Sequence, residues 1–202
     1  MSLSERPRDD VTDVAARARS AEAPQAAPPT PTPESPAPVR PSARFMRAHP
    51  AHWIALGFGS GLSPLAPGTV GTLWAWLAWA VLGLWLSPAQ LGWLLAASLP
   101  VAWWACTVTA EHLNVADPSA IVADEIVAFW LVLWLLLPAG FWAQLAAFAL
   151  FRLFDAIKRG PVGWADRLFH GARGWRAGFG IVLDDLVAAA CTLLVMALAR
   201  AL

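Results

Sequence analysis

Long stretches without a charged side chain decide what this chain can fold into. Residues 48–110, 126–151 and 186–199 contain no Lys, Arg, Asp or Glu. The sequence is 58% hydrophobic and 14% charged, whereas a soluble domain is about 45–50% apolar and about 25% charged. Roughly 20 apolar residues span a bilayer as a helix. We therefore expect an integral membrane protein.

Breaks rich in proline, glycine and serine divide these stretches into helix candidates. The pattern predicts an all-α integral membrane bundle of about four to five hydrophobic helices. The candidates lie near residues 70–86, 91–110, 119–137, 140–157 and 181–200. The fourth has the shortest charge-free run, so a tilted or re-entrant segment is the alternative there.

The first fifty residues differ in composition from the rest. They hold ten of the seventeen prolines, and residues 21–41 are mostly Ala, Pro, Ser and Thr. Such a segment buries too little apolar surface to offset its ordering entropy, and it lacks the apolar run of a secretory signal peptide. We expect residues 1–50 to be a disordered Ala/Pro-rich tail and residues 51–202 to be the helical membrane domain.

Charge and cysteine content exclude several functions. The 14 basic and 14 acidic residues balance, which argues against nucleic-acid binding. Cys106 and Cys191 lie inside apolar stretches, so neither a disulfide framework nor a zinc site is indicated. The four histidines show no metal-ligand spacing.

Basic residues predict the orientation in the membrane. Arg40, Arg44 and Arg47 precede the first helix candidate, and six basic residues lie within 152–176. Because positive residues favour the cytoplasmic side, we expect a multi-pass chain with the polar segments of its core at the cytoplasmic face.

Carboxylates gather at the same predicted face. Asp124 and Glu125 fall in the first turn of the third helix candidate, Asp184 and Asp185 in the first turn of the fifth, and Asp155 at the inner end of the fourth. Each acid alone could simply complement a helix dipole. Several at one membrane depth are costly unless paired, hydrated or bound to a cation. Oxygen ligands favour hard cations, so we expect such a site.

A glycine-rich segment, residues 57–71 (GFGSGLSPLAPGTVG), precedes the first helix candidate. Its five glycines and two prolines interrupt a helix and can bring backbone N–H groups close to an anion. Ser63, Thr69 and the following helix N-terminus add donors. The segment lacks the Gly-Lys-Ser/Thr ending of a nucleotide-binding P-loop. The alternative is an ordinary irregular entry to a membrane helix.

Three blocks together resemble the phosphatidylglycerophosphatase A family of bacterial membrane lipid phosphatases. They are residues 59–71 (GSGLSPLAPGTVG), 117–125 (DPSAIVADE) and 151–158 (FRLFDAIK), the last continuing through Asp166-Arg167 to residues 178–185 (GFGIVLDD). The resemblance implies Mg²⁺-dependent hydrolysis of phosphatidylglycerophosphate to phosphatidylglycerol and phosphate in phospholipid biosynthesis. It implies a multi-pass enzyme of the bacterial inner (cytoplasmic) membrane, with its active site facing the cytoplasm.

The resemblance also implies roles for residues in these blocks. The expected metal ligands are Asp124, Glu125, Asp155, Asp166, Asp184 and Asp185. The expected catalytic residues are Asp124, Glu125, Asp155, Arg152, Lys158 and Asp185, with Arg152 and Lys158 as phosphate partners. For substrate binding we expect Ser63, Gly68, Thr69, Gly71 and Arg167.

The chain departs from the family pattern at three places. It reads Lys158-Arg-Gly-Pro161 where the family usually has Lys-Pro-x-Pro, and Ala123 stands where Trp is frequent. Residues 172–177 separate Gly171 from Gly178, a glycine pair that is normally adjacent. None of these departures removes an acid.

A small ion-coupled transporter is the alternative function, because membrane carboxylates can form a cation or proton pathway. Clustering of the acids at one interface, no acid in mid-helix and no visible inverted repeat favour the phosphatase. A non-catalytic membrane scaffold with a metal-stabilised loop is the third hypothesis. For the phosphatase, direct attack by water and a covalent aspartyl-phosphate both remain open.

Overall fold

The apolar stretches form helices, which confirms the all-α prediction. A computed structural model describes residues 37–115, 118–157, 160–169 and 172–201, and these ranges contain no strand. The predicted disordered tail lies almost wholly outside the described residues. The elements are α2 (Ala43–Arg47), α3 (Pro50–Ala55), the 3-10 helix η1 (Gly57–Leu62), α4 (Pro67–Leu82), α5 (Pro88–Leu113), α6 (Ala123–Leu135), α7 (Phe141–Ile157), α8 (Pro161–Leu168) and α9 (Trp175–Ala201).

Two of the described helices, α5 and α9, are long and apolar enough to cross a membrane. They have 26 and 27 residues with mean hydropathies of 1.5 and 2.2. Large apolar side chains also lie on the outside of the bundle, with Trp85, Trp93 and Trp142 between 76% and 77% exposed. Exposed apolar surface on this scale suits a lipid environment better than water. The expected four to five spans remain a prediction.

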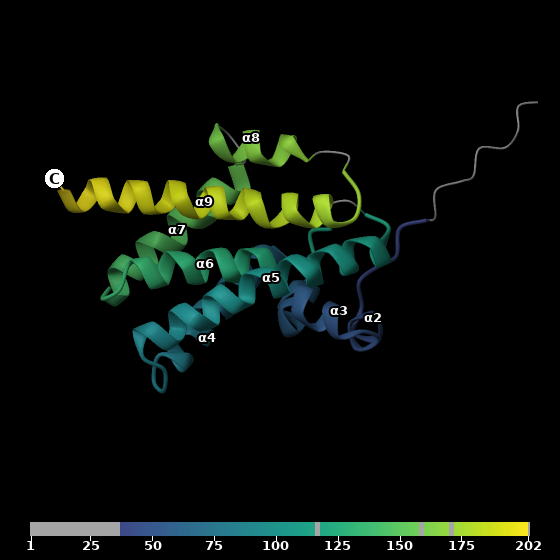
Figure 1. Cartoon of the computed structure of the whole chain (residues 1–202), viewed down its shortest axis with the longest axis horizontal. Helices are drawn as coiled ribbons and strands as arrows, with labels where there is room; N and C mark the ends of the chain where they lie inside the picture. Colours follow the sequence, from purple (N-terminus) through teal and green to yellow (C-terminus); the bar gives the residue numbers. More distant parts are fainter. Residues whose placement is uncertain (1–36, 116–117, 158–159, 170–171, 202) are drawn as a thin grey trace, which may run out of the picture. The chain divides into compact units, whose positions relative to one another are not determined.

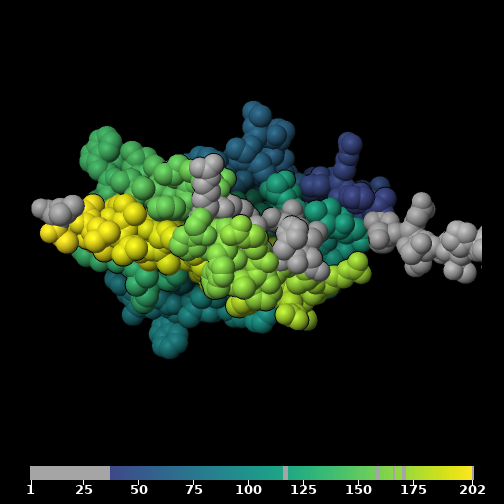
Figure 2. All heavy atoms as spheres, turned by 90° about the horizontal axis from the view of Figure 1, so that it is seen from above, coloured from purple at the N-terminus to yellow at the C-terminus, as the bar shows by residue number. Residues whose placement is uncertain are grey.

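The helix α6 is the centre of the packing. It contacts α4, α5, α7 and α9, and its Phe129 and Val132 are completely buried. Figure 1 shows α9 running alongside α6. Helix α8 packs on α9 and covers part of the α9 surface in Figure 2. Apolar contacts therefore hold together the helices that carry the acids.

The glycine-rich segment is more helical than the sequence indicates. Gly57–Leu62 form η1, whose backbone is kinked. Helix α4 begins at Pro67 instead of near residue 70, because proline is favoured in the first turn, where its missing N–H has no intrahelical partner. Gly68, Thr69 and Gly71 consequently lie in the first turns of α4.

Helix α9 corrects one prediction about the acids. It begins at Trp175, well before residue 181. Gly178 lies inside it, and the missing side chain lets α9 pack against Thr107 of α5. The placement of Asp184 and Asp185 in a first helical turn is therefore wrong, because they lie about 14 Å along the axis from Trp175. The statement that no acid lies in mid-helix, which counted against a transporter, is wrong for the same reason.

The other acids lie where the sequence places them. Asp124 and Glu125 are in the first turn of α6, and Asp155 is in the last turn of α7. The start of α6 is later than residue 119 because the preceding segment packs on α3, where the Val122 N–H donates to the Ala55 carbonyl at 2.9 Å.

His49 and His52, at the start of α3, meet His112, which lies sixty residues after His52 at the end of α5. His52 Nδ1 lies 2.8 Å from the Phe45 carbonyl, and His52 Nε2 lies 2.8 Å from His112 Nδ1. The ring of His49 lies 5.4 Å from that of His52. A carbonyl only accepts, so Nδ1 of His52 carries a proton and, in the neutral ring, Nε2 accepts from His112. Burial, followed by the nearby His112 and His49, lowers the pKa of His52, although the bond to Phe45 opposes this.

We expect acidification to destabilise the fold through His52. Its pKa in the folded chain lies below the ordinary value of 6.5, so the unfolded chain binds the proton first. Stability from the neutral ring is thus present above pH 6.5 and lost as the pH falls below it. In detergent, the wild-type melting temperature should fall a few degrees more than that of His52→Gln between about pH 7.5 and about pH 5.5. Equal falls in the two proteins would contradict this assignment.

Candidate active site

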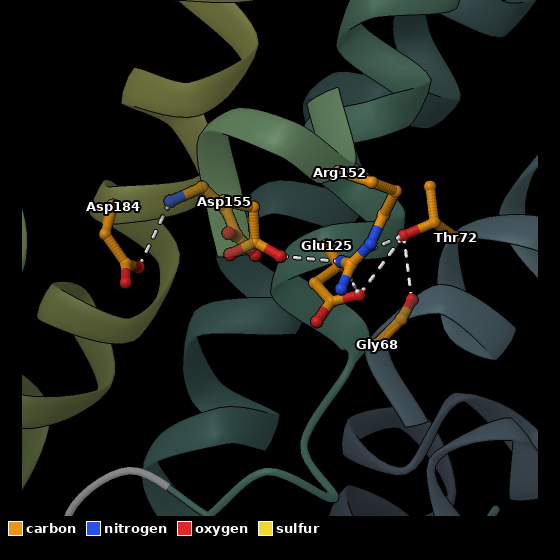
Figure 3. A network of polar contacts seen from close by, with 7 residues as sticks. Gly68, Thr72, Glu125, Arg152, Asp155 and Asp184 are labelled. Atoms are coloured by element: carbon orange, nitrogen blue, oxygen red, sulfur yellow. Dashed lines mark hydrogen bonds and ion pairs between the residues drawn. The ribbon is translucent and has the colours of Figure 1, made fainter. Parts of the chain in front are cut away.

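Helices α4, α6, α7 and α9 bring polar side chains together inside the apolar bundle. Figure 3 shows Gly68 and Thr72 of α4 beside Glu125 of α6 and Arg152 of α7. The start of α4, the start of α6 and the end of α7 meet here, together with the middle of α9. The sequence predicts that the acids converge, but it places the start of α9 near residue 181 instead of at Trp175.

Arg152 is the centre of the network. Its Nη1 donates to Glu125 Oε2 at 2.8 Å and to Asp155 Oδ2 at 2.6 Å. The spacing of three residues on α7 puts Arg152 and Asp155 on the same face. The three side chains are only 18%, 13% and 11% exposed. Removing one partner of a pair so withdrawn from water leaves the other charge uncompensated, which is strongly destabilising.

Thr72 connects α4 to this ion pair. Its hydroxyl donates to the Gly68 carbonyl at 2.8 Å and lies 3.2 Å from Glu125 Oε2, and Arg152 Nη1 lies 3.4 Å from it. The side chain is completely buried. The sequence analysis did not select Thr72. The available signal was a polar residue four positions after Gly68, which helical periodicity places on the same face.

Gly68 lets the backbone of α4 pack directly on the ion pair. A Cβ atom at this position would overlap the Glu125 carboxylate and lie 2.8 Å from Arg152 Nη2. Any side chain here would push the guanidinium and carboxylate apart. The structure thus brings Gly68, a predicted substrate-binding residue, to the acid cluster.

The acids outnumber the cation that is paired with them in the described structure. Buried carboxylates lie at Asp124, Asp155, Asp184 and Asp185, which are between 2% and 8% exposed. Asp185 is close enough to the other three and to Glu125 for like charges to repel. The Asp184 carboxylate accepts from the backbone N–H of Asp185 at 3.1 Å. Buried carboxylates this close to one another are costly unless protons or cations compensate their charge.

By donor type, the acid cluster suits a hard divalent cation. All of its candidate ligands are oxygen atoms, which Mg²⁺ prefers. Asp185 Oδ2 is buried without a hydrogen-bond partner in the described structure. Within the described residues, no three acidic, histidine or cysteine side chains are already arranged to hold an ion. The side chain of Asp166 and the whole of Lys158 lie outside what the structure describes, so their predicted roles remain predictions.

The other predicted substrate-binding residues are more scattered. Ser63 Oγ donates to the Leu65 carbonyl at 2.8 Å in the turn before α4. Gly71 packs against Val122, and Arg167 is exposed on α8. Thr69 is half-buried in the first turn of α4. Within the described structure, the glycine-rich segment reaches the ion pair through Gly68.

The network also contains an unused donor. Arg152 Nε is buried and has no hydrogen-bond partner among the described residues. Unpaired buried polar atoms are uncommon in folded proteins and call for an explanation. A guanidinium N–H suits the oxygen of an anionic group such as a phosphate, and an acidic cluster suits the cation that would accompany it.

Comparison with known proteins identifies the family of the chain. A family model described as Phosphatidylglycerophosphatase A matches residues 53–200. The chain belongs to the phosphatidylglycerophosphatase A family. It is therefore a phosphatase, and its family and apolar helices indicate a membrane protein. The acids in the middle of α9 do not make it a transporter.

Three relatives illustrate the range of this similarity. Phosphatidylglycerophosphatase A of Escherichia coli K12 is 37% identical over 72% of this chain and 81% of its own length. Phosphatidylglycerophosphatase A of Haemophilus influenzae is 34% identical over 77% and 92%. A Bacteroides thetaiotaomicron protein, whose name proposes a phosphatidylinositol-3-phosphatase, is 37% identical over 73% and 91%. No solved structure matches the chain.

The close approach of Gly68 to the ion pair gives a direct test of the site. Gly68→Ala should displace Glu125 and Arg152 and lower phosphatase activity by about 10²-fold, because small displacements in a site have effects of this size. The control is Gly83→Ala at the other end of α4, where an added Cβ meets its nearest atom at 3.3 Å. Normal activity of Gly68→Ala in folded protein would place the reaction elsewhere.

Proposed function

We propose that this phosphatase hydrolyses the terminal phosphate of phosphatidylglycerophosphate, giving phosphatidylglycerol and inorganic phosphate in phospholipid biosynthesis. Two of its relatives are named for this activity. The observation that supports it best is the buried Arg152 network, which lies within the residues matched by the family model. The network provides a guanidinium donor, which suits an anionic headgroup, beside carboxylates that could hold an accompanying cation.

Arg152 is proposed to bind the phosphate. Its Nη1 is occupied by Glu125 and Asp155, whereas its Nε has no partner in the described structure. Because Nε is buried, a phosphoryl oxygen would have to displace the atoms that cover it, and it would then gain a charge-assisted hydrogen bond. Lys158 and Arg167 are proposed as additional phosphate partners on the basis of the family resemblance.

Mg²⁺ is proposed as the cofactor, held by ligands drawn from the acid cluster. Asp124, Asp155 and Asp185 are the main candidates, and Glu125, Asp166 and Asp184 complete the proposed set. When bound, the ion would neutralise phosphate charge and lower the pKa of a bound water. Without positive charge, the carboxylates would repel a phosphate monoester.

Two carboxylates are oriented to take a proton during hydrolysis. Arg152 holds one oxygen of Glu125 and one of Asp155, which also fixes the direction of Glu125 Oε1 and Asp155 Oδ1. We propose that one of these atoms accepts a proton from the attacking water. The Thr72 hydroxyl, 3.2 Å from Glu125 Oε2, helps to fix the position of the Glu125 side chain.

The proposed location is the inner membrane of a bacterium, with several spans and the site facing the cytoplasm. The support is the cluster of basic residues before the first predicted span and within 152–176, which favours the cytoplasmic side. The B. thetaiotaomicron relative has a name that proposes a different lipid phosphate. The headgroup beyond the phosphate is therefore a question for direct assay.

Phosphate release by the purified full-length chain in detergent micelles tests the proposal. The substrates are phosphatidylglycerophosphate and phosphatidic acid, each with and without Mg²⁺. We expect Mg²⁺-dependent release that is faster from phosphatidylglycerophosphate. Asp155→Asn should lower it by at least about 10²-fold, because it removes a proposed ligand and one partner of Arg152. Glu111→Gln, at an exposed acid of α5, is the matched control and should keep its activity.

Three results would contradict parts of the proposal. Phosphate release that does not depend on Mg²⁺ would contradict the proposed metal cofactor. Equal activity of Asp155→Asn and Glu111→Gln would contradict the proposed role of the acid cluster in the reaction. A radiolabelled phosphoenzyme trapped by acid quenching would replace direct attack by water with the covalent route.

A further inference from the structure

An apolar groove lies beside the polar site, between α4 and α7. Its volume is about 430 Å³, within the range of small-molecule sites. The lining residues are Leu73, Trp76, Leu77, Ala80, Phe141 and Gln144. Long side chains connect the two helices here. The ring of Trp76 stacks on that of Phe141, with the ring centres 5.6 Å apart.

Both walls of the groove lead to the Arg152 network. On α4 the lining residues are spaced at three and four positions, which is one helix face, and one of them, Trp76, lies four positions after Thr72 and so neighbours it along the helix. On α7, Gln144 and Arg152 are eight residues apart and also share a face. Between them, Phe148 stacks on Trp76 at 5.7 Å. Trp76 and Phe148 thus lie between the groove and Arg152, so the groove and the polar site follow one another between the same two helices.

The surface of the groove is almost entirely carbon. Its one polar side chain, Gln144, accepts from Trp76 Nε1 at 2.6 Å and donates to the Ala139 carbonyl at 2.8 Å. Both ends of the amide are thus used within the wall. Leu77 and Phe141 are 58% and 61% exposed, so the groove opens to the outside of the bundle and not into its core.

We propose that this groove binds an acyl chain of the lipid phosphate whose phosphate lies at Arg152. This inference rests on the proposed function and adds a determinant of substrate class. Its basis is that the polar site and the groove lie in succession between the same two helices, α4 and α7, because a membrane phospholipid carries its polar headgroup and its apolar chains on one molecule. From Leu73 to Ala80 the groove wall runs about 10 Å along α4, which accommodates a stretch of extended chain.

Filling the groove tests the proposal. Ala80→Trp places an indole on the wall at an exposed position, so folding should be retained. The control is Ala146→Trp, the same substitution at an exposed position of α7 outside the lining. Each variant is assayed with long-chain (dioleoyl) and short-chain (dihexanoyl) phosphatidylglycerophosphate in mixed micelles. We expect Ala80→Trp to lower kcat/KM for the long-chain lipid by about tenfold, the effect of losing a few buried methylenes, and to leave the short-chain lipid unchanged.

The outcomes distinguish an effect on acyl-chain binding in the groove from an effect on the reaction at the polar site. Equal losses on both lipids would overturn the proposal, because the groove would then only shape the polar site. No loss on either lipid would also overturn it and would place the chain in the surrounding bilayer, as would a matching loss in Ala146→Trp. If the wild type releases no phosphate from either lipid, the proposed function itself fails.

Photo-crosslinking provides a readout that does not need turnover. A phosphatidylglycerophosphate with a diazirine on its acyl chain should label α4 and α7 in wild type and less so in Ala80→Trp. Excess unlabelled substrate should reduce this labelling, and excess phosphatidylcholine should not. Labelling that both lipids reduce equally would identify bulk lipid as the occupant and overturn the proposal.

Discussion

The buried guanidinium of Arg152 is the interaction on which the polar site depends. It joins α7 to α6 through Glu125 and reaches α4 through Thr72. Ion pairs of this kind are not a source of stability, because removing both charges from water costs about as much as their attraction returns. The apolar packing around α6 must therefore hold the helices together. The ion pair restricts them to arrangements in which Arg152 keeps its carboxylate partners.

Several buried acids lie close together around Arg152. Arg152 is paired with Glu125 and Asp155, while Asp184 and Asp185 lie buried on α9 nearby. Repulsion within such a group is relieved by protons or by a cation. Under the proposed function, a bound cation would reduce the repulsion between these carboxylates and a phosphate monoester, which connects the proposed cofactor to substrate binding.

Helix α4 has a different role at each end. Gly68 and Thr72 in its first turns contact the ion pair, whereas its middle forms one wall of the apolar groove. A helix that begins in a polar site and continues along apolar surface suits a substrate with the same division. Gly68 is essential to this arrangement because no other residue lets the α4 backbone approach the carboxylate so closely.

The sequence by itself determined the helical class and several acid positions. Charge-free runs and breaks are local properties, and they correctly placed Asp124 and Glu125 at a helix start and Asp155 at a helix end. The start of α9 was decided by tertiary packing, because Gly178 reads as a break but is used for close contact with Thr107. Thr72 and the histidine cluster depend on contacts between residues 53 or more positions apart. Only the folded chain specifies such contacts, since no short-range pattern records which helix faces meet.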